Sequence, residues 1–132
     1  REEDKIDLFG LAYKGNIDDV RDSPAMKIAD KLLDGSFNVS IYDPFVRPDK
    51  VSLKLSTFEQ TLFDADVLLI LTDHDEFKQL DWKRVKKLMK TPTVIDTKNC
   101  IQNNTGEINY YNYSNLYNLG RKSSITKGKQ QV

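Results

Sequence analysis

The chain has 132 residues, a length typical of one compact domain, and its only cysteine, Cys100, cannot form an internal disulfide, which favours a reducing cytoplasm. Twenty lysines and arginines balance twenty aspartates and glutamates, so no net charge favours nucleic acid or an acidic membrane as a partner. No apolar run approaches the ~20 residues of a membrane span, and the charged residues 1–5 do not resemble a signal peptide.

Short apolar runs alternate with amphipathic stretches, a pattern typical of βαβ units and a parallel sheet. The first strand is predicted over Lys5–Phe9, and a long loop over 10–22 follows it. Ser23-Pro24 predicts a helix start, because serine is a favoured N-cap and proline at the first helical position sacrifices no hydrogen bond. Gly35 should end this helix. Its predicted inward face consists of Ala25, Ile28, Ala29, Leu32 and Leu33.

The rest of the chain continues the alternation. A strand is predicted over Asn38–Tyr42, a helix over 57–65, and a central strand over the unbroken apolar run 67–71. A helix over 81–89 and a strand over Thr93–Asp96 follow, and 116–119 is predicted as an edge strand. The inward residues of the 81–89 helix are predicted to be Trp82, Val85, Leu88 and Met89. Tyr110, Tyr111, Tyr113 and Tyr117 are interpreted as edge-strand and surface packing.

These elements predict an α/β fold, a Rossmann-like, doubly wound and mostly parallel sheet with helices on both faces in three layers. The predicted domain covers residues 1–121, and the polar, basic residues 122–132 are predicted to form a disordered tail. In such sheets ligands bind outside the carboxyl ends of the strands. Those ends are the loops at 10–22, 43–46, 72–76 and 96–100.

The first of these loops carries a ring and a cation together, Tyr13 and Lys14, and then Arg21 just before the helix start. Free N–H groups and the macrodipole at a helix N-terminus attract anions, so a cation beside one is typical of a phosphate site. The residues fit a second interpretation equally well. Lys14 would then be a solvated loop residue, and Arg21 would pair with Asp18 or Asp19.

Two common phosphate-binding motifs do not fit this loop. It is not a P-loop, because Lys14 precedes Gly15 and no Ser or Thr follows the lysine. It is not the dinucleotide fingerprint either, because no glycine stands two residues after Gly10. The class of nucleotide that this loop binds can therefore be predicted only from a longer pattern.

Residues 10–25, Gly-Leu-Ala-Tyr-Lys-Gly-Asn-Ile-Asp-Asp-Val-Arg-Asp-Ser-Pro-Ala, provide such a pattern. They resemble the G-L-A-(F/Y)-K-x-N-x-D-D-x-R-(E/D)-S-P-A signature that opens the C-terminal domain of the UDP-glucose/GDP-mannose dehydrogenase family. The resemblance covers roughly residues 5–121. Further matches follow in the family's order, namely Tyr-Asp-Pro at 42–44, Asp-Ala-Asp at 64–66 with Thr-Asp-His-Asp-Glu-Phe at 72–77, and Asp-Thr-Lys-Asn at 96–99.

The resemblance implies a function. Members of the family oxidise C6 of a nucleotide sugar twice with NAD, giving a uronic acid. An N-terminal domain binds NAD and carries the catalytic cysteine, a central helical segment mediates dimerisation, and the C-terminal domain closes over the nucleotide. This chain contains neither the glycine fingerprint nor the cysteine motif of the N-terminal half. It is therefore expected to be the UDP-sugar-binding domain of a longer, homodimeric, cytoplasmic enzyme of surface polysaccharide (capsule) synthesis, and to be inactive alone.

The same resemblance assigns site residues. Tyr13 and Lys14 match the aromatic–lysine pair that meets the nucleotide sugar, and Lys98 matches a basic residue, often arginine in relatives, that also reaches it. Arg21 matches an arginine near NAD at the domain junction. No catalytic residue and no metal ligand is expected. His74 is predicted to be a solvated loop histidine, and Cys100 a small buried hydrophobe.

The Asn-Ile-Asp-Asp form of the loop at 16–19 and the Asp73-His74 segment look more like the UDP-N-acetylhexosamine branch of the family than the UDP-glucose branch. UDP-N-acetylmannosamine is the first expectation for the substrate and UDP-glucose the alternative. Two other classes of protein are alternatives to a dehydrogenase domain. A receiver-like signalling domain shares the sheet, but its acidic pair should directly follow the first strand, whereas Asp18-Asp19 come later. A stand-alone nucleotide-binding module would lack a dehydrogenase partner.

Overall fold

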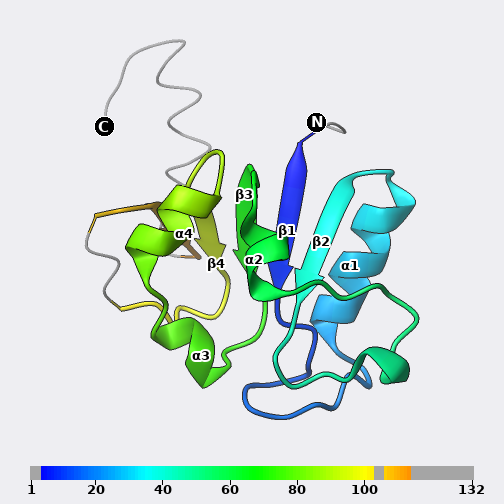
Figure 1. The fold of residues 1–132 in the computed structure, drawn as a ribbon. Coiled ribbons are helices and arrows are strands. Elements are labelled where there is room, and N and C mark those ends of the chain that lie inside the picture. The colour runs from blue at the N-terminus through cyan, green and yellow to red at the C-terminus, as the bar shows by residue number, and fades with distance from the viewer. Residues whose placement is uncertain (1–3, 103–105, 114–132) are drawn as a thin grey trace.

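The computed structural model describes residues 4–102 and 106–113 of the chain. Its strands form one parallel sheet in the order β2-β1-β3-β4-β5 (Figure 1). The bounds are Lys5–Phe9 for β1, Asn38–Tyr42 for β2, Val67–Ile70 for β3, Thr93–Asp96 for β4 and Asn109–Asn112 for β5. The register aligns the last residue of each strand with that of its neighbour, so every strand in the described part ends at one edge.

The order of the strands reverses beside β1. The chain passes from β1 to β2 on one side and later returns to pair β3 on the other side of β1. The gap between β1 and β3 at the carboxyl edge is therefore the topological switch point, where open α/β sheets usually bind ligands. In Figure 1 this edge is at the bottom, where the β1–α1 loop and α3 lie.

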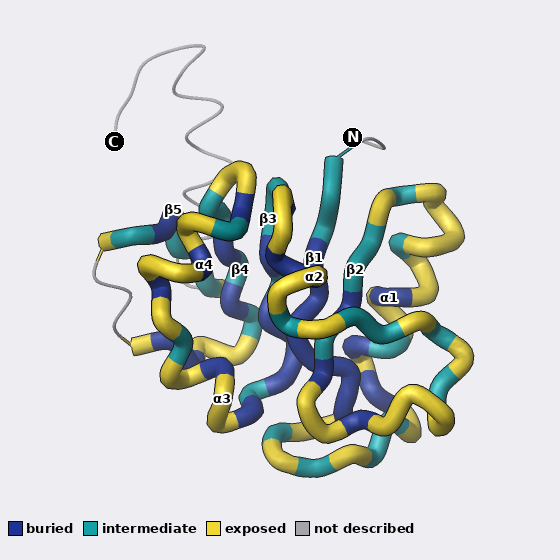
Figure 2. Tube along the Cα trace, in the orientation of Figure 1, coloured by how far each residue is buried: buried dark blue, intermediate teal, exposed yellow. Residues whose placement is uncertain are grey.

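The helices cover both faces of the sheet, as the sequence predicts. The main helices are α1 (Pro24–Asp34), α2 (Phe58–Leu62), α3 (Asp75–Lys78) and α4 (Trp82–Leu88), and a short 3₁₀ turn, η1, spans Pro48–Lys50. One apolar cluster lies between α1 and one face of the sheet. The other lies between the opposite face and the helices α2, α3 and α4. Figure 2 shows buried stretches in the central strands β1, β3 and β4, whereas the helices are partly exposed.

Helix α1 begins as predicted, because Ser23 is its N-cap and accepts a hydrogen bond from the Ala25 N–H at 3.2 Å. Its buried face is narrower than predicted. Ala25 and Ala29 are buried, but Ile28 and Leu33 are 37% and 41% exposed. Two small alanines on one stripe bring the helix backbone close to the sheet, so residues at the margins of the stripe remain outside the contact.

Two helices differ in length from the prediction. Helix α2 ends at Leu62 rather than at residue 65, because Phe63 leaves the helical conformation and Asp64 takes a positive φ of 60°. Helix α3 was not predicted, since its single turn is too short for an apolar period. The bounds of α4 agree to within one residue at each end, with Asp81 as the N-cap, and Trp82 and Val85 are buried.

Beyond β4 the described sheet ends at β5, which contains Tyr110 and Tyr111, and its other edge is β2. The edge strand predicted over 116–119 and the tail predicted over 122–132 lie outside the described residues. Asn-Tyr-Tyr-Asn has no apolar alternation, which explains why the sequence did not single it out as a strand. Within the described ranges, no helix is both long and apolar enough to cross a membrane.

Candidate functional site

The β1 loop lies directly against the loop that follows β3, and two glycines permit this contact. Gly10 has a φ of 102°, and a Cβ added there would lie 2.4 Å from the Cβ of Thr72. A Cβ on Gly15 would lie 2.4 Å from the carbonyl oxygen of Asp73. Both distances are far shorter than a carbon contact allows. Gly10 and Gly15 therefore let the β1 loop fill the switch point.

A buried carboxylate, Asp43, holds this loop from the end of β2. Its Oδ2 accepts hydrogen bonds from the N–H groups of Leu11 at 2.7 Å and Ala12 at 3.2 Å. Its Oδ1 accepts from the N–H groups of Phe45 and Val46. Burial alone would raise the pKa of Asp43. The hydrogen bonds from His74 and from backbone N–H groups outweigh burial, and the pKa is lowered.

His74 completes this network, and the prediction that it is a solvated loop residue is wrong. Its side chain is fully buried. Nε2 lies 2.9 Å from Oδ2 of Asp43, and Nδ1 accepts a hydrogen bond from the Asn16 N–H at 2.8 Å. The ring stacks on Phe45, with centroids 4.8 Å apart. The sequence misleads here because the neighbours of His74 are polar, whereas the turn that starts α3 directs its side chain inward.

Tyr13 and Lys14 are displayed on the outside of the loop that these anchors hold. The Tyr13 N–H donates to the carbonyl of Asp19 at 2.7 Å and closes the segment between them. The Tyr13 side chain is 53% exposed, and Lys14 is exposed. No ion pair involves Lys14 within residues 4–102 and 106–113. The structure thus places an aromatic ring and an uncompensated cation next to each other at the carboxyl edge.

Arg21 forms the ion pair that the alternative interpretation of the loop expected. Its Nε and Nη2 donate to the two carboxylate oxygens of Asp19 at 3.0 and 2.8 Å, and its side chain is 86% exposed. This hydrogen bond is the main reason why the pKa of Asp19 is lowered to about 2. Tyr13, Asp19, Arg21 and Asp22 together line a shallow pocket of about 280 Å³. Two of the predicted site residues, Tyr13 and Arg21, therefore meet in one pocket.

Lys98 lies on the loop after β4, and a second buried carboxylate holds that loop. Oδ1 of Asp96 accepts from the Lys98 N–H at 3.1 Å, and Oδ2 accepts from the Ile101 N–H at 2.8 Å and from the hydroxyl of Tyr110 at 2.9 Å. The Lys98 side chain is exposed and makes no ion pair with the described residues. The β1 and β4 loops, which carry Lys14 and Lys98, flank the end of β3.

Sequence reasoning missed the anchoring roles of Asp43, Asp96 and Asn16. Each lies within a quoted motif, but a motif does not distinguish a residue that contacts a ligand from one that holds a loop. Asn16 has a φ of 62°, and its side-chain oxygen accepts from the Asp75 N–H at the start of α3 at 2.9 Å. An aspartate at the carboxyl end of a predicted strand, or directly after it, would have been the available signal for these two residues.

Cys100 is buried, as predicted, and its surroundings make it a poor nucleophile. Burial, followed by the nearby Asp96 carboxylate, raises the pKa of the thiol to about 12. The thiolate that a nucleophilic cysteine requires is therefore scarce at neutral pH.

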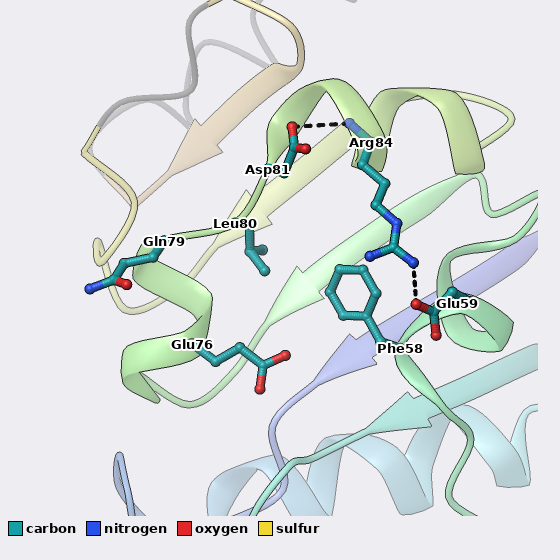
Figure 3. A pocket seen from close by; sticks show the side chains of 7 residues that line it. All are labelled: Phe58, Glu59, Glu76, Gln79, Leu80, Asp81 and Arg84. Atoms are coloured by element: carbon teal, nitrogen blue, oxygen red, sulfur yellow. Dashed lines mark hydrogen bonds and ion pairs between the residues drawn. The ribbon is translucent and has the colours of Figure 1, made fainter.

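A second pocket, of about 310 Å³, opens among α2, α3 and α4 on the other side of the domain from α1 (Figure 3). Arg84 forms an ion pair with Glu59 and lies over the ring of Phe58 at 5.3 Å. Glu76 accepts a hydrogen bond from the hydroxyl of Tyr42 at 2.7 Å. Because these charged groups already have partners, this pocket offers less to an anionic ligand than the lysine loops do.

Comparison with known proteins identifies the family. A model described as the UDP-binding domain of the UDP-glucose/GDP-mannose dehydrogenase family matches residues 7–103. UDP-N-acetyl-D-mannosamine dehydrogenase of Methanococcus aeolicus is 40% identical over 111 residues, which cover 82% of this chain and 25% of that protein. UDP-glucose 6-dehydrogenase YwqF of Bacillus subtilis is 33% identical over 133 residues, which cover 96% of this chain and 29% of that protein.

A solved structure agrees with this result. The UDP-N-acetyl-mannosamine dehydrogenase Cap5O from S. aureus matches with a TM-score of 0.77 at 38% identity, over 89% of this chain and 28% of that one. The present chain spans about a quarter of the length of the curated relatives it matches first. These matches favour the predicted family over a receiver-like domain. The chain belongs to the UDP-glucose/GDP-mannose dehydrogenase family and comprises its UDP-binding domain.

Proposed function

We propose that the chain binds a UDP-sugar at the carboxyl edge of its sheet, as one domain of an NAD-dependent nucleotide-sugar 6-dehydrogenase. The proposed substrate is UDP-N-acetylmannosamine or a related UDP-N-acetylhexosamine, which is oxidised to its uronic acid for surface polysaccharides such as a capsule. The relatives named for UDP-N-acetyl-D-mannosamine support this choice. UDP-glucose is the second candidate, because a UDP-glucose 6-dehydrogenase is 33% identical over nearly the whole chain.

The observation that carries the proposal is the pair of exposed lysines on anchored loops. Lys14 and Lys98 have no ionic partner among the described residues, while buried Asp43 and Asp96 hold the backbones of their loops. An ammonium group is a strong donor to phosphate oxygens. Two such groups on either side of the switch point suit a diphosphate, and Tyr13 beside them offers a ring face to a sugar or base.

NAD is proposed as the cofactor of the longer enzyme, but the residues present here do not form a dinucleotide site. The N–H groups of Leu11 and Ala12 donate to Asp43, and the Ala25 N–H at the start of α1 donates to Ser23. The β1 loop therefore offers few free N–H groups to a pyrophosphate, and it lacks the glycine fingerprint. We assign only Arg21 to the cofactor, as a residue that reaches NAD held by another domain.

The remaining parts of the proposal concern the longer protein. An N-terminal NAD-binding domain and a central helical domain are proposed as partners of this one, and the full enzyme as a cytoplasmic homodimer. In this arrangement the present domain binds and orients the UDP-sugar with Tyr13, Lys14 and Lys98, while the oxidation takes place on groups supplied by the other domains. The burial of Cys100, the one cysteine of this sequence, is consistent with oxidation on groups of the other domains.

The proposal is tested by titrating the isotopically labelled chain with UDP and following backbone amide shifts. We expect the shifts to be confined to the segments around residues 13–15 and 97–99. The affinity should be weaker than about 1 µM, because a site with one wall lacks part of its contacts and its preorganisation. Uridine without phosphates is the control and should cause far smaller shifts. Equal shifts with uridine, or shifts centred on the pocket at Phe58 and Glu76, would contradict the proposal.

A further inference from the structure

We propose that His74 is a positioning residue, which holds Tyr13 and Lys14 in the conformation that binds the UDP-sugar. This inference rests on the proposed function of the β1 loop. His74 cannot contact a ligand itself, because its side chain is fully buried and both ring nitrogens already face protein groups. Any influence on binding must pass through the residues that it touches.

Those residues bracket the Tyr13-Lys14 pair. On the N-terminal side, the N–H groups of Leu11 and Ala12 donate to Asp43, whose Oδ2 also faces Nε2 of His74. On the C-terminal side, the Asn16 N–H donates directly to Nδ1 of His74. Hydrogen bonds to the His74–Asp43 pair thus hold both ends of the segment between Ala12 and Asn16. Replacing this pair would release both ends of the segment together.

The hydrogen bonds also determine the protonation state of the ring. The Asn16 N–H can only donate, so Nδ1 must present its lone pair. Nε2 then carries the proton and donates it to the Asp43 carboxylate. His74 is therefore a neutral imidazole with its proton on Nε2. Glutamine, which has an acceptor oxygen and a donor NH2 group on a planar amide, can imitate this pattern in part, whereas phenylalanine keeps an aromatic ring at this position and loses both bonds.

Two aromatic neighbours pack against the His74 ring but make no hydrogen bond to it. Phe45 stacks on one side of His74, and Phe77 contacts it with ring centroids 5.3 Å apart. Both contacts are apolar and would be retained by phenylalanine at position 74. A His74→Phe variant therefore removes the polar connections selectively and leaves the packing of the ring in place.

The experiment compares UDP binding by the 132-residue chain with His74, with His74→Phe, with His74→Gln and with Val85→Ala. Val85→Ala is the matched control, because it removes two buried methyl groups from α4 in one apolar cluster, whereas Leu11 and Ala12 of the β1 loop belong to the other cluster. At a temperature well below all four melting points, we expect His74→Phe to weaken UDP binding about tenfold or more. Val85→Ala should bind as the parent chain does, and His74→Gln should recover part of the loss.

Equal affinities of His74→Phe and Val85→Ala would overturn the proposal, since His74 would then act only on stability. Two further measurements test the positioning role of His74 without any ligand, and the second of them needs only the parent chain. Hydrogen exchange at the Asn16 amide should be slow in the parent chain and fast in His74→Phe. The imidazole ¹⁵N spectrum should show a protonated Nε2 and an unprotonated Nδ1, and a protonated Nδ1 refutes the geometry. If the parent chain does not bind UDP, the proposed function fails, while the exchange and ¹⁵N results still test the positioning.

Discussion

Two buried aspartates, Asp43 and Asp96, perform the same task at the carboxyl edge of the sheet. Each accepts hydrogen bonds from backbone N–H groups of a loop that displays a lysine or leads to one. At Asp43 the hydrogen bonds from His74 and from backbone N–H groups outweigh burial and lower the pKa, so this carboxylate can hold its loop while buried. The lysines beyond these anchors can then remain uncompensated until an anion arrives.

Lys98→Ala is expected to weaken UDP binding about ten- to a hundredfold, because one charge-assisted hydrogen bond contributes roughly 1.5–3 kcal/mol. Lys98→Arg should retain most of the affinity, since the positive charge and the donors remain. The amide-shift titration measures both. Lys83→Ala, which removes an exposed lysine from α4, is the control for a general loss of charge. An unchanged affinity of Lys98→Ala would remove Lys98 from the site.

Arg21→Ala is expected to change the melting temperature little, because an ion pair as exposed as that of Arg21 and Asp19 is screened by solvent. In a full-length enzyme the same change should raise the KM for NAD more than the KM for the UDP-sugar. Steady-state kinetics and thermal melts on one variant measure both effects. A lower melting temperature with an unchanged KM for NAD would restrict Arg21 to its partnership with Asp19.

Strand β1 contains a buried carboxyl group, that of Asp7, whose burial is unfavourable for the charged form. Asp7 is fully buried, and neither carboxylate oxygen has a hydrogen-bond partner in the described part of the protein. Burial raises its pKa to about 8, with Lys5 opposing this rise and Asp66 adding to it. The folded protein therefore holds a proton that the unfolded chain releases above pH 3.8. Because the folded state binds more protons in this window, the free energy of unfolding should fall as the pH rises from 3.8 to about 8.

Asp7→Asn removes this titration and should make stability less dependent on pH. We expect the variant to exceed the parent chain by about 1–3 kcal/mol in free energy of unfolding near pH 8, the cost of an uncompensated buried polar group. Near pH 4 the two should be similar. Urea denaturation at both pH values measures the difference, with Asp30→Asn on the exposed side of α1 as the control. A constant difference at the two pH values would show that Asp7 does not titrate in this window.

The hydroxyl of Ser23 both donates and accepts a hydrogen bond at the start of helix α1. Oγ donates to the Leu11 carbonyl at 2.6 Å and accepts from the Ala25 N–H. Ser23→Ala should lower the free energy of unfolding by about 0.5–2 kcal/mol, since it removes an N-cap and leaves a buried carbonyl without this donor. Urea denaturation measures the loss. Ser52→Ala in an exposed loop should cause almost no change, and an equally small effect at position 23 would contradict the role of the cap.

For the whole molecule, we expect no NAD-dependent oxidation of any UDP-sugar by the isolated chain. Its β1 loop is filled by its own hydrogen bonds, and its buried thiol has a pKa raised to about 12. The absorbance of reduced NAD, followed with purified chain, NAD and UDP-N-acetylmannosamine or UDP-glucose, tests this. A rate above that of a blank without protein would show that the catalytic groups lie here after all.

Several features could be predicted from the sequence because each depends on neighbours along the chain. The apolar runs set β1, β2 and β4 at the observed bounds, and Ser23-Pro24 set the start of α1. The predicted fold class and family are confirmed as well. The assignments of Tyr13, Lys14 and Lys98 to the UDP-sugar and of Arg21 to NAD remain predictions, although the structure places all four at the carboxyl edge.

What only the tertiary structure decided depends on contacts between distant segments. His74 and Asp43 are 31 residues apart and His74 and Asn16 are 58 apart, so no local pattern reveals that they meet in a buried network. The exposure of Ile28 and Leu33 depends on how closely α1 approaches the sheet, which its own sequence does not specify. The sequence by itself thus determined the order of the elements and the family, through local periodicity and motifs. The burial of a polar side chain was decided by packing, because it depends on which distant groups can satisfy its hydrogen bonds.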